Sequence, residues 1–384
     1  MSVREGNRVT LLENGAAYFP ALIAAIDAAT REVHLETYIF EADATGLAVA
    51  EALMRAARRG VKVRLLLDGF GCRTFPVSLS ARLDEAGVAL LFYRPEVARF
   101  RMRRYRLRRL HRKLAVIDAR IAFVGGINVI DDASGAGPLA QRFDYAVEVE
   151  GPLLADIYPA VRRLWLLVRW SRLGRRPRKS PPLPVVAVPA GPLRAEFLQR
   201  DNLRHRRAIE EAYLAALAGA REEILLANAY FIPGRRFRQA LVDAARRGVR
   251  VVLVLQGRTD HPIYQLTARA LYRHFLENGI EIYEYHGSEL HAKAAVVDGR
   301  WATIGSSNID PFSLFLAREA NIAVHDAGFA DELRVSLHAA MARGAHAIHH
   351  QGWRRIPWYQ KFASWLFYGL ARWLLGLLRI AQRD

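Results

Sequence analysis

The chain repeats itself, and this internal duplication restricts the folds that it can adopt. The hexapeptide AARRGV occurs at residues 56–61 and again at residues 244–249, which lie 188 positions apart. In each half the hexapeptide ends a helical stretch between two apolar, strand-like runs, and its glycine is expected to stop the helix. These runs cover residues 31–40, 62–69, 222–231 and 251–257. Apolar strands connected through a helix are typical of parallel strands in an α/β layer, so the sequence predicts two similar halves built on βαβ units.

A second repeat places polar residues on strand-like segments. Each copy has a histidine followed by Lys at +2, Asp at +7, Gly at +14 and Asn at +17. The copies are His111, Lys113, Asp118 and Asn128 in the first half, and His291, Lys293, Asp298 and Asn308 in the second. A single histidine on an apolar strand is most often a core residue, but recurrence at fixed offsets argues against that interpretation here. Alternate residues of a strand face the same side, so each histidine is expected to project beside its lysine.

Turn signals follow both motif strands. Asp298-Gly299, and Asp118-Ala119 as its counterpart, predict hairpins that return through residues 121–125 and 301–305. We expect Asp118 and Asp298 to support these turns, or to pair with a basic residue, rather than to touch a ligand. The small residues that follow the returning strands, among them Gly126 and Ser306, would let the backbone approach a ligand closely.

The repeated residue types suit the transfer of a phosphoryl group. The lysines and the two asparagines supply positive charge and hydrogen-bond donors to an anion whose charge rises in the transition state. Two imidazoles, with unperturbed pKa values near ~6.5, suit a nucleophile and a general acid/base. One would form a phosphohistidine, while the other would protonate the departing alcohol and deprotonate the incoming one. Because the lysines supply the positive charge, we expect no metal and no cofactor.

Each imidazole also needs a partner for its second ring nitrogen. The next strand of each half offers one carboxylate, which is Asp144 in the first half and Glu319 in the second. We expect these two carboxylates to orient the histidines.

Basic residues outnumber acidic ones, at 56 against 38, and give a net charge of +18. Such an excess indicates a polyanionic partner, such as nucleic acid, an anionic membrane or a phosphorylated substrate. The charge is concentrated at residues 99–113, where nine residues are Lys or Arg and none is acidic. The expected insert at residues 94–110 has no counterpart in the second half and is either a membrane-docking loop or a solvated one. Its candidate docking residues are Arg101, Arg103, Arg104 and Arg106.

Tryptophan, leucine and basic residues also mix in the C-terminal residues 346–384 and in residues 161–170. The C-terminal segment predicts an interfacial amphipathic helix, with a helix that caps the domain as the alternative. Its candidate membrane-docking residues are Trp358, Trp365, Trp373 and Arg372. No run of about 18 uncharged apolar residues predicts a spanning helix, and the N-terminus lacks a run of signal-peptide length. The single cysteine, Cys72, fits a reducing compartment.

The expected domain organisation follows from these features. Residues 1–184 form the first half, and they include the insert and a basic, proline-rich linker at residues 171–184. Residues 185–345 form the second half, and residues 346–384 form the C-terminal tail.

The two copies of H-x-K-x4-D, each followed by G-[GS]-x-N, resemble the phospholipase D superfamily. Residues 123–128, 143–152 and 305–314 are similar to the shorter, B-type bacterial cardiolipin synthases. The resemblance implies an α/β fold of two phospholipase D-like halves, with mixed, mostly parallel sheets flanked by helices, packed pseudo-symmetrically around one active site. It also implies that both His-Lys pairs share that site, and that Asp118 and Asp298 complete the active-site motif as further catalytic residues. By the same resemblance, His111 is the nucleophile and His291 the acid/base.

The activity implied by the resemblance is transfer of a phosphatidyl group from one phosphatidylglycerol to the hydroxyl of another, with release of glycerol. Phosphatidylethanolamine is the donor in related proteins, and a phospholipase D-type hydrolase or phosphodiesterase on phospholipid or nucleic acid is the alternative. A non-catalytic membrane-binding protein is a further alternative, against which the intact histidines and lysines argue. The expected partner is an anionic membrane with phosphatidylglycerol and cardiolipin, at the cytoplasmic face of the bacterial inner membrane, where the protein would be peripheral or monotopic. No nucleic-acid partner is expected, and the oligomeric state is left open.

Overall fold

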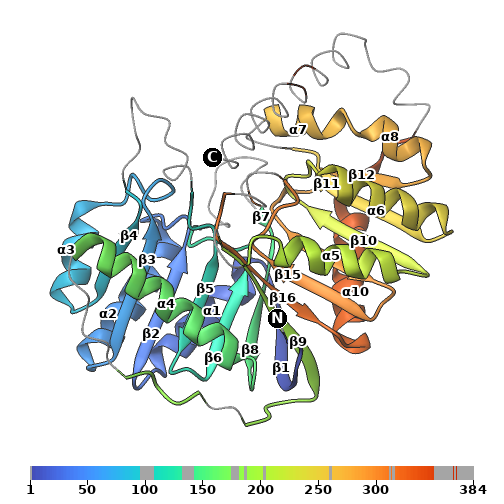
Figure 1. Ribbon diagram of the computed structural model, residues 1–384. Coiled ribbons are helices and arrows are strands. Elements are labelled where there is room, and N and C mark those ends of the chain that lie inside the picture. Colours follow the sequence, from blue (N-terminus) through green and yellow to red (C-terminus); the bar gives the residue numbers. More distant parts are fainter. Residues whose placement is uncertain are drawn as a thin grey trace, which may run out of the picture.

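The duplication appears directly in the architecture of the computed structural model (Figure 1). The structure describes residues 2–95, 108–131, 142–173, 181–185, 188–201, 205–258, 262–310, 313, 316–349, 366 and 369. One mixed sheet of 15 strands runs through both halves, in the order β17-β12-β11-β10-β14-β15-β16-β9-β1-β8-β6-β5-β2-β3-β4. The seven strands of the first half, counted outward from β1, correspond in order to seven strands of the second half, counted outward from β9. The predicted α/β fold of two similar halves is therefore confirmed.

The elements alternate along the chain as the periodicity predicts. The first half contains β1 (Arg4–Glu13), α1 (Asn14–Asp27), β2 (Glu32–Thr37), α2 (Ala44–Arg58), β3 (Lys62–Asp68), α3 (Val77–Glu85), β4 (Ala89–Tyr93), β5 (Lys113–Ile117), β6 (Ile121–Gly125), β7 (Arg142–Phe143), β8 (Tyr145–Glu150) and α4 (Leu154–Leu173). The second contains β9 (Leu193–Arg200), α5 (Ala208–Gly219), β10 (Glu223–Asn228), α6 (Arg235–Arg246), β11 (Arg250–Gln256), α7 (Pro262–Arg269), α8 (Tyr272–Glu277), β12 (Glu281–Tyr285), β13 (Glu289–Leu290), β14 (Lys293–Val297), β15 (Trp301–Gly305), β16 (Glu319–Val324), α10 (Ala327–Gly344) and β17 (Ala345–Ala347).

Strand direction depends on the type of connection. β2, β3 and β4 are parallel, as are β10, β11 and β12, because helices connect them. The expectation of mostly parallel strands therefore holds for these βαβ units. The motif strands β5 and β14 instead pair antiparallel with both neighbours, since tight hairpins join them to β6 and β15. Their first residues consequently lie at the carboxyl ends of β2 and β10.

The repeated AARRGV hexapeptide has two local functions. Gly60 and Gly248 adopt φ values of +87° and +88°, a conformation that glycine allows at low cost, and so end α2 and α6 as predicted. The preceding Arg59 donates from Nη2 to carbonyl groups at the end of α1, and Arg247 does the same at the end of α5. The hexapeptide therefore stops one helix and caps its neighbour in both halves.

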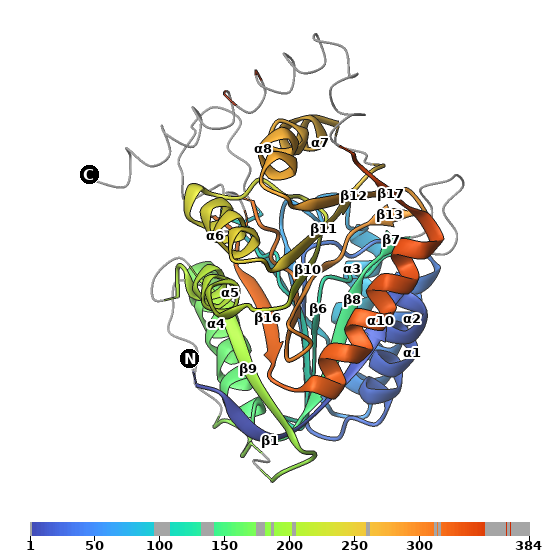
Figure 2. The same ribbon diagram turned by 90° about the vertical axis from the view of Figure 1, so that its right-hand side faces the viewer.

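Three large apolar clusters hold the sheet and helices together. One packs α1 and α2 on the outer face of the first half, and another packs α5 and α6 on the outer face of the second. The third contains residues from α4, α10 and strands of both halves, so the halves share one core. Figure 2 shows α5 and α6 on one side of the second-half strands and α10 on the other. This shared core holds the two motif strands in a fixed relation.

The structure revises two predicted boundaries. α4 continues to Leu173, so the first residues of the expected linker at 171–184 are helical. β17 pairs with β12, so the second half extends past residue 345 into the segment expected to be tail. The predicted membrane-docking arginines of the insert and the tryptophans and arginine of the tail lie outside the described residues. In the described part of the chain, no helix combines the length and apolar character needed to cross a bilayer.

Candidate active site

Both motif strands begin at a lysine that points into the protein. Lys113 is 3% exposed and Lys293 is 1% exposed. Lys113 Nζ donates a hydrogen bond of 3.0 Å to the carbonyl oxygen of His111, and Lys293 Nζ donates to that of His291. Burial lowers the pKa of Lys113 to about 7 and that of Lys293 to about 8, although nearby carboxylates oppose this effect. A bound anion would favour the charged form of both lysines, so the pair is suited to hold a phosphate group.

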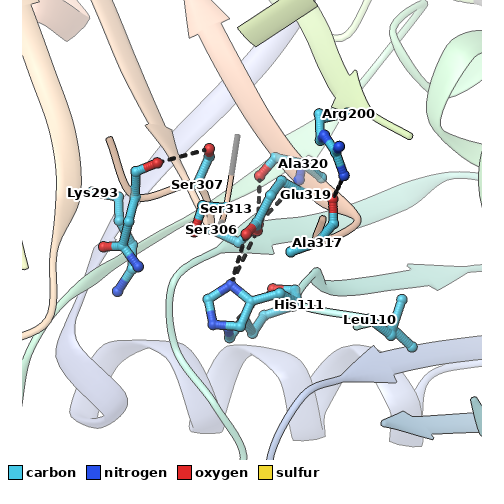
Figure 3. Close-up of polar contacts among 12 residues, drawn as sticks. Leu110, His111, Arg200, Lys293, Ser306, Ser307, Ser313, Ala317, Glu319 and Ala320 are labelled. Carbon is cyan, nitrogen blue, oxygen red and sulfur yellow. Dashed lines mark hydrogen bonds and ion pairs between the residues drawn. The ribbon is translucent and has the colours of Figure 1, made fainter. Parts of the chain in front are cut away.

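Each catalytic candidate histidine is held by a carboxylate from the other half. His111 Nδ1 lies 3.0 and 3.1 Å from the two carboxylate oxygens of Glu319 (Figure 3). His291 Nδ1 lies 2.5 Å from Asp144 Oδ2. The sequence predicts both carboxylates, and it places each one strand after the histidine of its own half. The structure exchanges them, so that each half completes the histidine of the other.

The exchange is fixed by backbone pairing between the halves. β13 pairs in parallel with β7, and the His291 N–H donates to the carbonyl oxygen of Phe143 at 2.9 Å. On the other side, the His111 N–H donates to the carbonyl oxygen of Arg318 at 3.0 Å. In both cases the accepting residue directly precedes the carboxylate that binds the imidazole. The backbone pairing thus places each carboxylate next to the ring that it orients.

The two histidines belong to one site. Burial lowers the pKa of His291 well below its usual value, and positive charge on Lys293, Arg142, Lys113 and His111 lowers it further. Burial also lowers the pKa of His111, against the opposing charge of Glu319. The two dyads, each of which joins a histidine of one half to a carboxylate of the other, place both rings at the junction of the halves. The side chains of His111 and His291 remain 15% and 12% exposed, so solvent or substrate can reach both.

The two predicted asparagines have equivalent positions. Asn128 Oδ1 accepts a hydrogen bond of 3.3 Å from the Ile39 N–H, and Asn308 Oδ1 accepts one of 3.3 Å from the Tyr230 N–H. Because the oxygen of each amide is held by the main chain, its Nδ2 group is the part that can donate to a ligand. Donation by both amides to a ligand stays a prediction.

Gly126 and Ser306 do not have the position that their prediction as phosphate ligands requires. A Cβ atom on Gly126 would lie 2.3 Å from Asp144 Oδ1, so the missing side chain makes room for a carboxylate. Ser306 has no exposed surface, and its Oγ donates to Glu319 Oε2 at 2.5 Å. Both residues therefore position carboxylates, and this function replaces direct contact with phosphate.

Asp118 and Asp298 lie at the opposite ends of the motif strands from the lysines. Each adopts a positive φ, and its carboxylate accepts hydrogen bonds from three consecutive backbone N–H groups. These amides belong to residues 30–32 for Asp118 and residues 221–223 for Asp298, at the starts of β2 and β10. The catalytic role that the family resemblance implies for both aspartates is therefore corrected to a structural function, as the turn signal itself suggested.

We expect Asp118→Ala to lower the free energy of unfolding by about 2 kcal/mol, because three backbone donors lose a charged acceptor. The kcat of the folded protein should fall by less than about tenfold, since no reacting group is removed. Burial alone would raise the pKa of Asp118, but its hydrogen bonds outweigh burial and lower the pKa. Its contribution to stability is therefore present at neutral pH and lost as the pH falls through that lowered pKa. Urea unfolding at pH 7 and pH 3 measures this, and Asp298→Ala serves as the matched variant.

Sequence reasoning missed two residues that contact this site. Tyr38 packs its ring edge-on against His111, with centroids 4.9 Å apart, and Lys113 Nζ lies 5.5 Å from the Tyr38 ring centroid. Arg200 is buried beside Glu319 at the end of β9 (Figure 3). Neither belongs to the repeated pattern. Tyr38 could have been predicted from its position directly after β2, because the motif residues lie at this end of the strand.

Comparison with known proteins gives a consistent assignment. A family model described as "Cardiolipin synthase, PLD-like domain" matches residues 22–164 and 213–341. Cardiolipin synthase B of Escherichia coli (strain K12) is 41% identical over 402 residues, which cover 100% of this chain and 94% of that protein. Cardiolipin synthase A of Klebsiella pneumoniae is 30% identical over 382 residues, which cover 95% of this chain and 75% of that protein.

Solved structures extend the comparison to the fold. The crystal structure of phosphatidylserine synthase from Haemophilus influenzae Rd KW20 superposes with a TM-score of 0.69 and 12% identity, over 96% of this chain and 94% of that one. Polyphosphate kinase from Porphyromonas gingivalis superposes with a TM-score of 0.59 and 16% identity, over 90% of this chain and 49% of that one. At these identities the likeness concerns the fold alone.

Proposed function

The chain belongs to the phospholipase D-like cardiolipin synthase family, and on this premise we propose that it transfers a phosphatidyl group from one phosphatidylglycerol to the hydroxyl of a second. The products are cardiolipin and glycerol. The observation that carries the proposal is the pair of exchanged dyads, His111–Glu319 and His291–Asp144, with two buried lysines between the halves. A nucleophile and an acid/base on opposite sides of one anion suit a two-step displacement at phosphorus.

In the first step, His111 attacks the phosphorus atom of the donor. A bond forms between Nε2 and phosphorus as the bond between phosphorus and the glycerol oxygen breaks. The negative charge of the bound donor phosphate favours the doubly protonated form of His291, against the effect of burial. His291 then gives its Nε2 proton to that oxygen, and neutral glycerol leaves. The carboxylates keep the Nδ1 proton of each ring in place, so that Nε2 is the atom that reacts.

In the second step, the hydroxyl of another phosphatidylglycerol attacks the phosphohistidine. Its proton passes to His291, its oxygen bonds to phosphorus, and the bond from phosphorus to His111 breaks. Lys113 and Lys293 stabilise the negative charge that grows on the phosphate in both steps, with the Nδ2 groups of Asn128 and Asn308 as further donors. Both histidines return to their starting protonation states.

The membrane partner is also part of the proposal. We expect the protein to dock peripherally on an anionic leaflet that contains phosphatidylglycerol and cardiolipin, at the cytoplasmic face of the bacterial inner membrane. The net charge of +18 favours such a surface. Leu167 and Trp170 on α4 are 42% and 48% exposed, and exposed arginines accompany them on the same helix. The basic insert and the C-terminal segment are the other candidate docking elements.

Purified protein incubated with phosphatidylglycerol vesicles tests the proposed reaction. We expect cardiolipin and glycerol in equal amounts, measured by mass spectrometry of the lipids and an enzymatic glycerol assay. Phosphatidic acid as the sole phospholipid product would indicate a hydrolase instead. Single-stranded DNA in a parallel reaction tests the phosphodiesterase alternative, and its cleavage without conversion of phosphatidylglycerol would favour that function. His111→Ala protein is the control for contaminating activity.

A further inference from the structure

A buried arginine lies behind the His111–Glu319 dyad. Arg200 is 3% exposed and stands directly opposite Glu319 in the antiparallel ladder of β9 with β16. Directly opposed residues in such a ladder project to the same face of the sheet. Arg200 Nη1 donates to the carbonyl oxygen of Ala317, two residues before Glu319, which holds His111 (Figure 3). Glu319 in turn raises the pKa of Arg200, so the two charges interact.

The other half has a neutral residue at the equivalent position. β1 and β8 correspond to β9 and β16, and the residue facing Asp144 there is Asn14, whose N–H donates to the Asp144 carbonyl at 2.8 Å. A second difference points the same way. Ser306 donates a hydroxyl hydrogen bond to Glu319, whereas its counterpart Gly126 has no side chain to give Asp144. Glu319 thus has a buried arginine and a serine hydroxyl near it, whereas Asp144 has the Tyr145 N–H at 2.8 Å and Lys293 Nζ at 3.9 Å.

We propose that Arg200, together with Ser306, is a positioning residue that holds the Glu319 carboxylate against His111 and thereby keeps His111 neutral with its Nε2 lone pair available. This inference rests on the proposed function, and it adds a reason why the two chemically similar dyads take different parts in it. An ionised partner fixes the proton of His111 on Nδ1 and stabilises the positive charge that the ring gains when Nε2 bonds to phosphorus. Asp144 has no equivalent arginine and hydroxyl, and the positive charges that act on it are those of Lys293, Lys113 and Arg142.

The charges around the dyad decide the direction of the expected effect. Glu319 interacts with Lys113 from β5 and Lys293 from β14, in addition to Arg200 from β9. Burial lowers the pKa of Arg200 to about 10, so the guanidinium is charged at neutral pH. Asp201, Arg318 and Arg108 also act on it. Removal of the Arg200 charge makes it easier for the His111–Glu319 pair to take up a proton, and a protonated pair cannot attack phosphorus.

The test compares Arg200→Gln, which keeps a donor for the Ala317 carbonyl but removes the charge, with Arg200→Lys, which keeps the charge. The pH dependence of kcat for cardiolipin formation is measured on phosphatidylglycerol vesicles. In Arg200→Gln we expect the acidic limb of the profile to move to higher pH by roughly one unit, with a loss of about tenfold in kcat at pH 6. In Arg200→Lys the limb should stay at the wild-type position. A purely structural role of Arg200 would lower kcat at every pH and leave the limb unmoved in both variants.

A matched control and a second variant complete the test. Arg64→Gln removes a half-buried arginine that pairs with Glu32, away from the dyads, and should leave the limb unmoved. If Arg200→Gln does not fold, as judged by circular dichroism, Ser306→Ala removes the other group that supports Glu319 and should move the limb in the same direction. An unmoved limb in the folded variant would overturn the inference while leaving the proposed function intact. Failure of the wild-type protein to form cardiolipin would instead overturn the proposed function.

Discussion

Replacement of either His111 or His291 by alanine is expected to lower kcat for cardiolipin formation by at least about 10⁴-fold, because residues that act as one catalytic unit show losses of this size. The kcat of the double variant should be at most about threefold lower than that of the less active single variant, since each change already stops the same reaction. Lipid analysis after incubation with phosphatidylglycerol vesicles measures both losses.

The two histidine variants should differ in the covalent intermediate. With a donor that carries a good leaving group and needs no protonation, His291→Ala protein should still accumulate a phosphatidyl-enzyme, because its nucleophile is intact. His111→Ala protein should form none, and intact-protein mass spectrometry after an alkaline quench distinguishes the two. His346→Ala is the matched control, since this exposed residue stacks on His286, with ring centroids 4.9 Å apart, at the outer edge of the second half. Label on the His111→Ala protein alone would reverse the assignment of nucleophile and acid/base.

The second large effect concerns the exchanged carboxylates. Glu319→Gln and Asp144→Asn are each expected to lower kcat by about 10²- to 10⁴-fold, because an amide favours the wrong imidazole tautomer while leaving the geometry nearly unchanged. The exchange itself predicts which ring responds. In spectra of protein labelled with ¹⁵N at histidine, Glu319→Gln should remove the deshielded Nδ1–H signal of His111, and Asp144→Asn that of His291.

Assignment of these signals uses the two histidine variants, each of which lacks one of them. Glu32→Gln is the control, because this buried carboxylate pairs with Arg64 and His34 rather than with the reactive rings. Loss of the His111 signal in Asp144→Asn would contradict the exchanged arrangement.

Local features of this fold could be predicted because local sequence determines them. The returning strands at residues 121–125 and 301–305 have the predicted bounds, since a turn signal and an apolar run define each hairpin. The helix stops at Gly60 and Gly248 follow from the conformational freedom of glycine. The repeated offsets likewise predict both histidines and both lysines, and the strand that follows each hairpin predicts the two orienting carboxylates.

The partners within the site could not be predicted, because they depend on contacts between distant parts of the chain. In a duplicated chain a carboxylate on the next strand of either half is an equally good partner by spacing alone. The choice is made by the pairing of Phe143 with Leu290 and by the bridge between Leu110 and Arg318, which join segments 147 and 208 residues apart. Ser306 was misassigned for a related reason: its offset marks its place in the pattern but not the direction in which its hydroxyl points.

The exchanged dyads also bear on how such an enzyme could arise. An ancestor with only one copy of the motif would have carried a histidine and a carboxylate that could not meet within the same molecule. It could have acted only as a symmetric dimer, in which the carboxylate of each subunit orients the histidine of the other. Fusion of two such genes would release that symmetry, because a mutation would then alter one side without altering the other. Arg200 opposite one carboxylate residue and Asn14 opposite the other is the kind of difference that a homodimer cannot acquire.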